Sequence, residues 1–443
     1  MGISINERVY GLSLLWKEAA YNFAYWDERP DLDWDKAYSD FLPLVMAEED
    51  PYEYYKLLER FVALLRDGHT FAEMPEELRP KYRAPVMTKY LEGKHILTCA
   101  PKEHEHLLYS EITSVNDMPL CDYLDMYVLP YIWHEKLDSA FFQGSVLGYA
   151  INCRERGVVT IGTAGGDFSY THGEKVEEAG VPDFYQLKHD EFKIMKNVVA
   201  SPDNILCIDI TADNIAYILV PSFVDKRLKD ELFKNIDLYK DCAGFVIDVR
   251  WNGGGNSDNA NALTQLFFDG AFREDPSDSP IYIANYGAYA QHRDLDKLDI
   301  SKPWEKKIYD IGKRKMFNRE SLEIRIKECP AYLNQPVVIL SSCVTASAAE
   351  SFLCLMKTNN RATIVGTASY GSNGQPFIGR LPGGGRYGIC TQKCYDMTGV
   401  SYNGTGILPD VPVEYTIADF KTQHDALFDA GLSVLRAKIL QHN

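Results

Sequence analysis

The chain has 443 residues, of which 46% are hydrophobic and 25% are charged, so it can bury a sizeable core and form two or three domains. A formal net charge of −17, without any Lys/Arg run, argues against binding of nucleic acid or of an anionic membrane. No apolar stretch approaches the roughly 20 residues that span a bilayer, so we expect no membrane anchor.

The compartment is indicated only by the cysteines and by the start of the chain. Ten cysteines are scattered singly, without a C-x-x-C pair, and Cys207, Cys343, Cys354 and Cys390 lie in apolar runs. Such usage favours buried thiols in a reducing compartment and gives no zinc signature, so we expect a cytoplasmic protein without metal or cofactor. The first 25 residues lack the pattern of a signal peptide; an exported chain whose signal has been removed fits the same residues.

Residues 1–80 are expected to form an N-terminal helical segment. Apolar and aromatic residues recur at helical spacing between residues 5 and 66, with a break near Pro30. This run ends in Arg66-Asp67-Gly68-His69-Thr70, where we expect Gly68 to stop the helix. His69 should then lie on a turn, where its imidazole is available.

Residues 81–200 are expected to form a small, mainly β domain, because short alternating runs at 95–98, 111–115 and 158–161 are separated by Gly, Asn and Pro. The segment 111–124 resembles a strand-turn of PDZ domains, which capture peptide ends by strand addition. A β domain with no peptide role fits equally well, since Asn-Asp turns occur in any hairpin. The polar stretch 162–204 predicts exposed loops or a mobile strand pair.

Residues 201–443 alternate between strand and helix patterns, which predicts an α/β domain. The predicted strands are 205–210, 216–220, 244–249, 336–341 and 362–366, and the predicted helices are 226–241, one from 257, and 346–358. A Tyr-rich insertion at 280–310 and a charged helical stretch to about 328 interrupt this alternation.

One motif is a buried-type strand that ends in Asn252-Gly253-Gly254-Gly255 before a helix. Glycines expose backbone N–H groups, which suits an oxyanion or a phosphate. A phosphate loop would need a following Gly-Lys-Ser/Thr, which is missing. An oxyanion site and a plain strand-to-helix turn both remain.

A second motif is an apolar strand followed by Thr345-Ala346-Ser347-Ala348-Ala349-Glu350. A serine at the first helical turn lies beside free N–H groups that can receive a developing negative charge, which is a nucleophile geometry. Helix starts also carry capping serines for structural reasons alone. The rival nucleophile Cys343 ends the strand without a nearby base and is interpreted as a buried thiol.

Together these motifs resemble the serine peptidases that include C-terminal processing (tail-specific) proteases and tricorn protease. The resemblance also rests on the segments Ile215–Ile218, Gly366-Thr367, Leu381-Pro-Gly-Gly and Gly406-Ile-Leu-Pro-Asp410. It implies a ClpP/crotonase-like α/β core in which Ser347 is the nucleophile. The implied oxyanion hole is the N–H of Ala348 with a loop glycine, Gly254 or Gly253. The implied substrate is a peptide or an unfolded protein.

The general base follows from which branch of the family the chain resembles. The lysine branch carries Gly-Lys-Gly after the Gly-x-Thr strand end, whereas this chain has Gly371-Ser372-Asn373 there. Asp67-Gly68-His69-Thr70 resembles the histidine motif of the tricorn-like branch, which implies that His69 is the base. A neutral imidazole can take the serine proton and return it to the leaving amine.

One departure concerns the residue that orients this histidine. The family commonly has a glutamate where this chain has Asn403, which can orient an imidazole but supplies no charge. Glu350, one turn beyond Ser347, fits first-turn dipole complementation as well as a catalytic role. The alternative to a peptidase is a non-catalytic protein that binds peptides or hydrophobic ligands on the same fold.

Overall fold

The computed structural model describes residues 2–81, 84–133, 140–180, 199–200, 205–315 and 317–442, with the side chains of 140–146 left aside. Most of the polar stretch expected over 162–204 lies outside the described residues, although its start forms strand β7 (Phe168–Thr171) and strand β8 (Glu178–Gly180).

The C-terminal half of the chain is built on a seven-stranded sheet. Its strand order is β22 (Val411–Pro412), β18 (Thr363–Gly366), β17 (Val337–Ser341), β12 (Gly244–Asp248), β11 (Ile215–Leu219), β10 (Cys207–Ile210) and β9 (Val199–Ala200). Strands β22 to β11 run parallel, and β10 and β9 are antiparallel additions at one edge. Because β12 and β17 are parallel neighbours, the loops after them leave the same end of the sheet.

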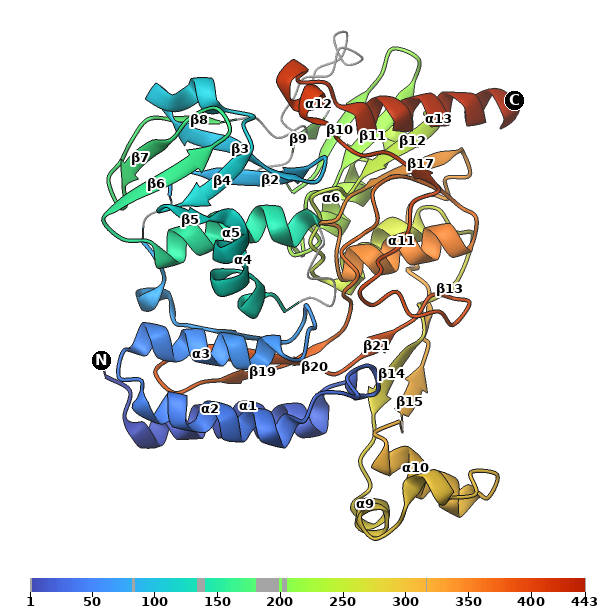
Figure 1. Cartoon of the computed structure of the whole chain (residues 1–443). Coiled ribbons are helices and arrows are strands. Elements are labelled where there is room, and N and C mark those ends of the chain that lie inside the picture. Colours follow the sequence, from blue (N-terminus) through green and yellow to red (C-terminus); the bar gives the residue numbers. More distant parts are fainter. Residues whose placement is uncertain are drawn as a thin grey trace.

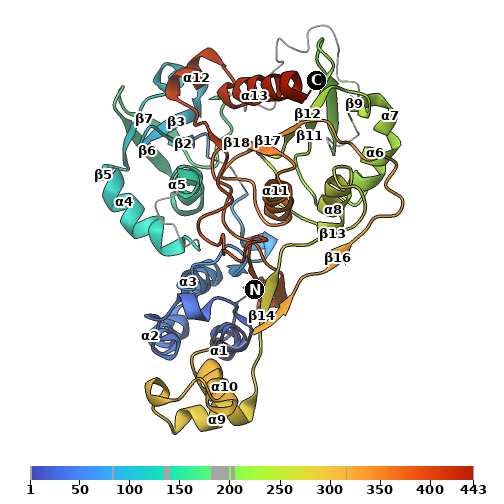
Figure 2. The ribbon, with the colours of Figure 1, turned by 90° about the vertical axis from the view of Figure 1, so that its right-hand side faces the viewer.

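Helices cover both faces of this sheet, as Figures 1 and 2 show. Alternate strand residues such as Phe245 and Ile339 pack with helices on one face, whereas Val246 and Val338 pack on the other. The first face is covered by α6 (Leu228–Lys234), α7 (Ile236–Tyr239), α8 (Ser257–Gln265) and α11 (Ala348–Thr358), and the second by α13 (Ala426–His442).

The N-terminal segment contains α1 (Ile5–Asn22), α2 (Trp34–Ala47) and α3 (Pro51–Ala63). It is joined to the C-terminal half by strand β1 (Phe71–Glu73), which pairs antiparallel with β20 (Arg386–Cys390), itself paired with β19 (Pro376–Arg380). Leu381, Tyr387 and Ile389 lie in the same hydrophobic core as the helices. The helical segment therefore packs on the C-terminal part of the chain.

The region 84–180 holds two small sheets with their own hydrophobic core. One contains β2 (Met87–Leu91), β3 (Lys94–Pro101) and β8; the other contains β5 (Met118–Pro119), β4 (Ile112–Val115), β6 (Val158–Thr163) and β7. Two helices, α4 (Leu120–Tyr127) and α5 (Ala140–Arg154), were not foreseen in a region predicted as mainly β. The division into 1–80, 81–200 and 201–443 remains a proposal.

The insertion after β13 (Phe272–Arg273) and β14 (Ser277–Pro280) projects as the pair α9 (Ala284–Gln291) and α10 (Pro303–Gly312) (Figure 1). The predicted helical stretch to residue 328 is wrong. Residues beyond 316 form β15 (Phe317–Glu320) and β16 (Glu323–Ile324) instead. Pairing of β15 with β14, reinforced by Arg319 on Asp278 at 2.7 Å, outweighs the helical charge pattern.

The cysteines are all free thiols. Cys354 and Cys390 are buried as expected, whereas Cys207 and Cys343 are partly exposed. Among the described helices, none is long and apolar enough to cross a membrane. In the same part of the chain, no group of three His, Cys, Asp or Glu side chains could hold a metal ion.

Candidate active site

Ser347 stands at the N-terminus of α11, after the turn that follows β17. Its backbone has φ 55° and ψ −126°, a region that non-glycine residues rarely adopt. Its N–H donates to the carbonyl of Ser372 and to Oε2 of Glu350, both at 3.1 Å. A strained turn held in this way, between a strand and a helix, is typical of a nucleophilic serine.

His69 lies on the turn between α3 and β1, as expected. The carboxylate of Asp67 accepts the His69 N–H at 3.1 Å, and the next residue, Thr70, accepts the N–H of Cys390 through Oγ1 at 3.1 Å. The backbone around the imidazole is therefore fixed both locally and by the strand that pairs with β20.

Gly68 has a different role from the one predicted. Helix α3 ends at Ala63, and the left-handed residue after it is Arg66, with φ 51°. A Cβ at Gly68 would lie 2.7 Å from Ser372 Oγ and 2.7 Å from a ring carbon of Tyr370. The absence of a side chain at Gly68 thus permits the close approach of the segment that contains Ser372.

The two predicted catalytic side chains meet across 278 residues of sequence. His69 Nε2 lies 3.1 Å from Ser347 Oγ, within hydrogen-bonding distance. The other ring nitrogen, Nδ1, lies 2.7 Å from Ser372 Oγ. If Nδ1 carries the proton and donates it to Ser372, Nε2 is free to accept the proton of Ser347.

Burial sets the protonation state of this histidine. Desolvation lowers the pKa of His69 from 6.5 to about 4, so its imidazole is neutral at neutral pH. A neutral imidazole is the form that a general base requires.

Glu350 is fully buried behind the catalytic pair. Its Oε1 accepts from Ser369 Oγ and from the Gly371 N–H, both at 2.6 Å, and its Oε2 accepts the N–H groups of Ser347 and Ser372, both at 3.1 Å. Burial raises the pKa of Glu350 to about 7, while these four donors act in the opposite direction. The carboxylate thus links the nucleophile turn to the segment that holds Ser372.

The predicted oxyanion-hole residues lie beside Ser347 but are not equivalent. In the described part of the chain, the N–H groups of Ala348 and Gly253 have no protein acceptor. Gly254 approaches so closely that a Cβ there would be 2.6 Å from that of Ser347, yet its N–H donates to Asn252 Oδ1 at 2.9 Å. Ala348 and Gly253 are therefore the donors available to a ligand.

Asn403 is placed away from the imidazole. Its Nδ2 donates to Glu28 Oε2 at 3.3 Å, whereas Ser372 occupies the position beside Nδ1 of His69. The sequence offered one clue to this arrangement, because Ser372 stands where the lysine branch of the family carries its base.

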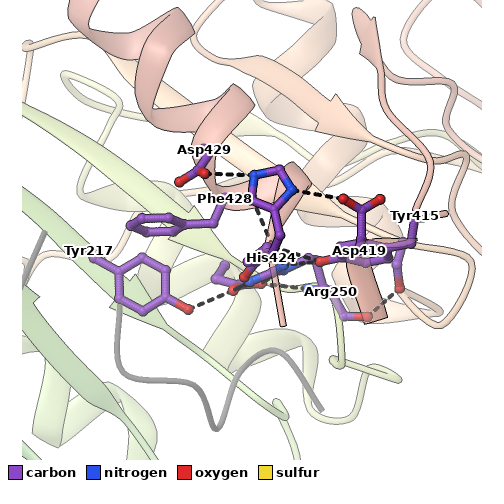
Figure 3. A network of polar contacts seen from close by, with 10 residues as sticks. Tyr217, Arg250, Tyr415, Asp419, His424, Phe428 and Asp429 are labelled. Atoms are coloured by element: carbon purple, nitrogen blue, oxygen red, sulfur yellow. Dashed lines mark hydrogen bonds and ion pairs between the residues drawn. The ribbon is translucent and has the colours of Figure 1, made fainter. Parts of the chain in front are cut away.

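A buried ionic network, which sequence reasoning missed, surrounds Arg250 just after β12 (Figure 3). Arg250 donates from Nε to both oxygens of Asp248 at 3.0 Å and from Nη1 to Asp425 at 2.7 Å, and all three side chains are at most 1% exposed. Tyr217 donates its hydroxyl to Asp248 at 2.6 Å. The network ties the end of β12 to the start of α13.

The chain is similar in sequence to known peptidases. Residues 214–413 match the model of Peptidase family S41. The chain is 25% identical over 232 residues to a carboxy-terminal-processing protease of Bartonella bacilliformis, a match that covers 51% of this chain and 44% of that protein. The match thus spans less than half the length of the curated relative.

Two solved structures are similar over nearly the whole chain. One is mature CPAF, with a TM-score of 0.71, 15% identity, and coverage of 99% of this chain and 98% of that chain. The other is a putative peptidase from Parabacteroides merdae, with a TM-score of 0.56, 17% identity, and coverage of 98% and 96%. At these identities the likeness concerns the fold, and the expected α/β class is confirmed.

Proposed function

Because residues 214–413 of this chain belong to peptidase family S41, we propose that it is a serine peptidase that hydrolyses peptide bonds through an acyl-enzyme on Ser347. The observation that carries the proposal is the 3.1 Å approach of His69 Nε2 to Ser347 Oγ. A nucleophile and a base within hydrogen-bonding distance of each other form the arrangement that activates a serine.

In the acylation step, Ser347 Oγ attacks the carbonyl carbon of the scissile bond while its proton passes to His69 Nε2. The carbonyl oxygen becomes an oxyanion, which the N–H groups of Ala348 and Gly253 can stabilise. When the C–N bond breaks, the imidazolium returns the proton to the leaving amine. An ester between the substrate and Ser347 remains.

In the deacylation step, water attacks the ester carbonyl and His69 takes a proton from that water. Collapse of the second tetrahedral intermediate releases the carboxylic acid and restores the Ser347 hydroxyl. The substrate is a peptide or an unfolded protein chain.

Ser372 is proposed as the positioning residue that replaces a charged partner of the histidine. Its hydroxyl accepts the Nδ1 proton and so selects the tautomer in which Nε2 is basic. A neutral hydroxyl stabilises imidazolium less than a carboxylate does. The carboxylate of Glu350 accepts the backbone N–H of Ser372 at 3.1 Å and so helps to hold this residue in place.

The proposal is tested with a fluorophosphonate probe, with the labelled residue mapped by mass spectrometry. We expect labelling at Ser347 in the wild type, none in Ser347→Ala, and a rate reduced at least about a hundredfold in His69→Ala. His424→Ala removes a surface histidine that pairs with Asp419 and Asp429, and it should label like the wild type. Loss of labelling should be accompanied by loss of casein hydrolysis.

An unlabelled wild type that is well folded would contradict the peptidase proposal and favour the non-catalytic, ligand-binding alternative. Labelling that persists in His69→Ala at the wild-type rate would contradict the role of the histidine alone.

A further inference from the structure

A cavity of about 890 Å³ lies between the N-terminal segment and the small two-sheet region. Helix α3 lines it on one side, β1 contributes Phe71 and Ala72, and α5 contributes Tyr149 and Ala150. Figure 1 shows α3 and α5 on either side of this part of the molecule. The cavity is large enough for more than one side chain of a peptide.

One wall of the cavity is formed by residues close to the proposed catalytic pair, in the sequence or through a hydrogen bond. Gly68 and Tyr370 both line it, and Gly68 directly precedes His69. The Tyr370 N–H donates to the carbonyl of Thr345 in the nucleophile turn at 2.8 Å, and Tyr370 lies two residues before Ser372. A peptide segment in the cavity would therefore lie next to the site of the proposed bond cleavage.

Aromatic rings and charged side chains both line the walls. Six rings besides that of Tyr370 contribute to them: Tyr52, Phe71, Tyr127, Tyr131, Trp133 and Tyr149. The hydroxyl of Tyr52 is already used, because it donates to the carbonyl of Cys153 at 2.7 Å. Aromatic faces bind other aromatic or large apolar groups through burial and ring packing.

Several of the charged groups in the walls have partners within the protein, such as Arg79 on Glu73. Lys56 Nζ contacts Glu59 Oε2 at 2.5 Å and lies 4.2 Å from the centre of the Tyr131 ring, with both charged side chains no more than 13% exposed. The guanidinium of Arg154 stacks 3.4 Å from the centre of the Tyr127 ring. The aromatic faces are therefore the part of the walls that suits a large apolar side chain.

We propose that this cavity is a specificity subsite that holds a large aromatic or aliphatic side chain of the peptide substrate, at a fixed position close to the scissile bond. The inference rests on the proposed peptidase function, since it assumes a peptide bound at Ser347. Burial of such a side chain should make a peptide bind at least about tenfold more tightly than the same peptide with alanine at that position.

Binding is measured first, on the Ser347→Ala protein, so that the result does not depend on catalysis. The probes are fluorescein-labelled 12-residue peptides in which each position in turn is Phe or Ala in an otherwise Gly/Ser sequence. We expect one position, or two neighbouring positions, at which Phe increases affinity by about tenfold over Ala. Equal affinity of the Phe and Ala peptides at every position would overturn the proposal.

The site is then tested by filling the cavity. Ala150 is 7% exposed and lines the cavity, so Ala150→Trp should abolish the preference for Phe in the binding assay. Ala288, on the exposed face of α9, provides the matched control, because Ala288→Trp adds the same side chain outside the cavity. Retention of the Phe preference in Ala150→Trp, or its equal loss in both variants, would place the subsite elsewhere.

A second variant guards against misfolding at position 150. Tyr131→Ala removes one ring from the wall and should weaken Phe-peptide binding without filling the cavity. Fluorophosphonate labelling of Ser347 reports on the catalytic proposal separately. Normal labelling without any Phe preference would refute the subsite alone, whereas a Phe preference without labelling would refute the peptidase function alone.

Discussion

Replacement of Ser372 by alanine should reduce turnover while the protein stays folded. The hydroxyl at this position lies 2.7 Å from His69 Nδ1 and holds the imidazole in the tautomer that can accept the Ser347 proton. In Ser372→Ala the ring loses this partner and the Nδ1 proton has no acceptor when the imidazolium forms.

The size of the effect follows from the hydrogen bond that is lost. Hydrogen bonds to charged groups contribute about 1.5–3 kcal/mol, and each 1.36 kcal/mol of barrier changes a rate by a factor of about ten. We therefore expect kcat to fall about ten- to hundredfold. KM should change little, because Ser372 stabilises the imidazolium and not the bound substrate.

The assay compares Ser372→Ala with Asn403→Ala on one peptide substrate at pH 7. Asn403 donates to Glu28 and not to the imidazole, so its replacement should change kcat less than about threefold. A wild-type kcat in Ser372→Ala would refute the positioning role of Ser372. A lower kcat in Asn403→Ala than in Ser372→Ala would assign that role to Asn403 instead.

Three further predictions concern the histidine, the glycine before it and the buried arginine. Burial lowers the pKa of His69 to about 4, so the imidazole stays neutral until the pH approaches that value. In a profile between pH 3.5 and 8, kcat/KM should therefore fall on the acid side only near pH 4, and a midpoint at or above 6.5 would contradict this. Gly68→Ala places a Cβ 2.7 Å from Ser372 Oγ, so kcat should drop at least about tenfold, and wild-type kinetics would show that the segment can move aside at no cost. Arg250→Met leaves Asp248 buried without its partner, which should lower the free energy of unfolding in urea by about 3–5 kcal/mol; a change below about 1 kcal/mol would argue against the network as a structural support.

Much of the central sheet could be predicted because its strands are continuous apolar runs. The runs at 244–249 and 336–341 correspond to β12 and β17, and the helix predicted to start at 346 begins two residues later, as α11. The insertion was less predictable. Its charged residues after 316 have a helical composition, and only pairing with β14 decides that they form a strand.

The candidate site likewise contains residues that the sequence predicted and residues that it did not. Ser347 and His69 were predicted from motifs together with the family resemblance that these motifs carry. The structure brings the two side chains together, and their catalytic roles stay predictions. Ser372 was overlooked as a partner of the histidine, because its contact with Nδ1 depends on how β1 pairs with β20 and not on any local pattern. Arg250 was likewise missed, since its partner Asp425 lies 175 residues away.

The separation of the catalytic pair also bears on the order in which the chain is made. His69 leaves the ribosome early, whereas Ser347 follows 278 residues later, and β20, which anchors the strand after His69, follows later still. No nascent chain shorter than this can assemble both groups. Until β20 has been made, the strand that follows His69 lacks its partner, so the proposed catalytic pair can assemble only late in synthesis.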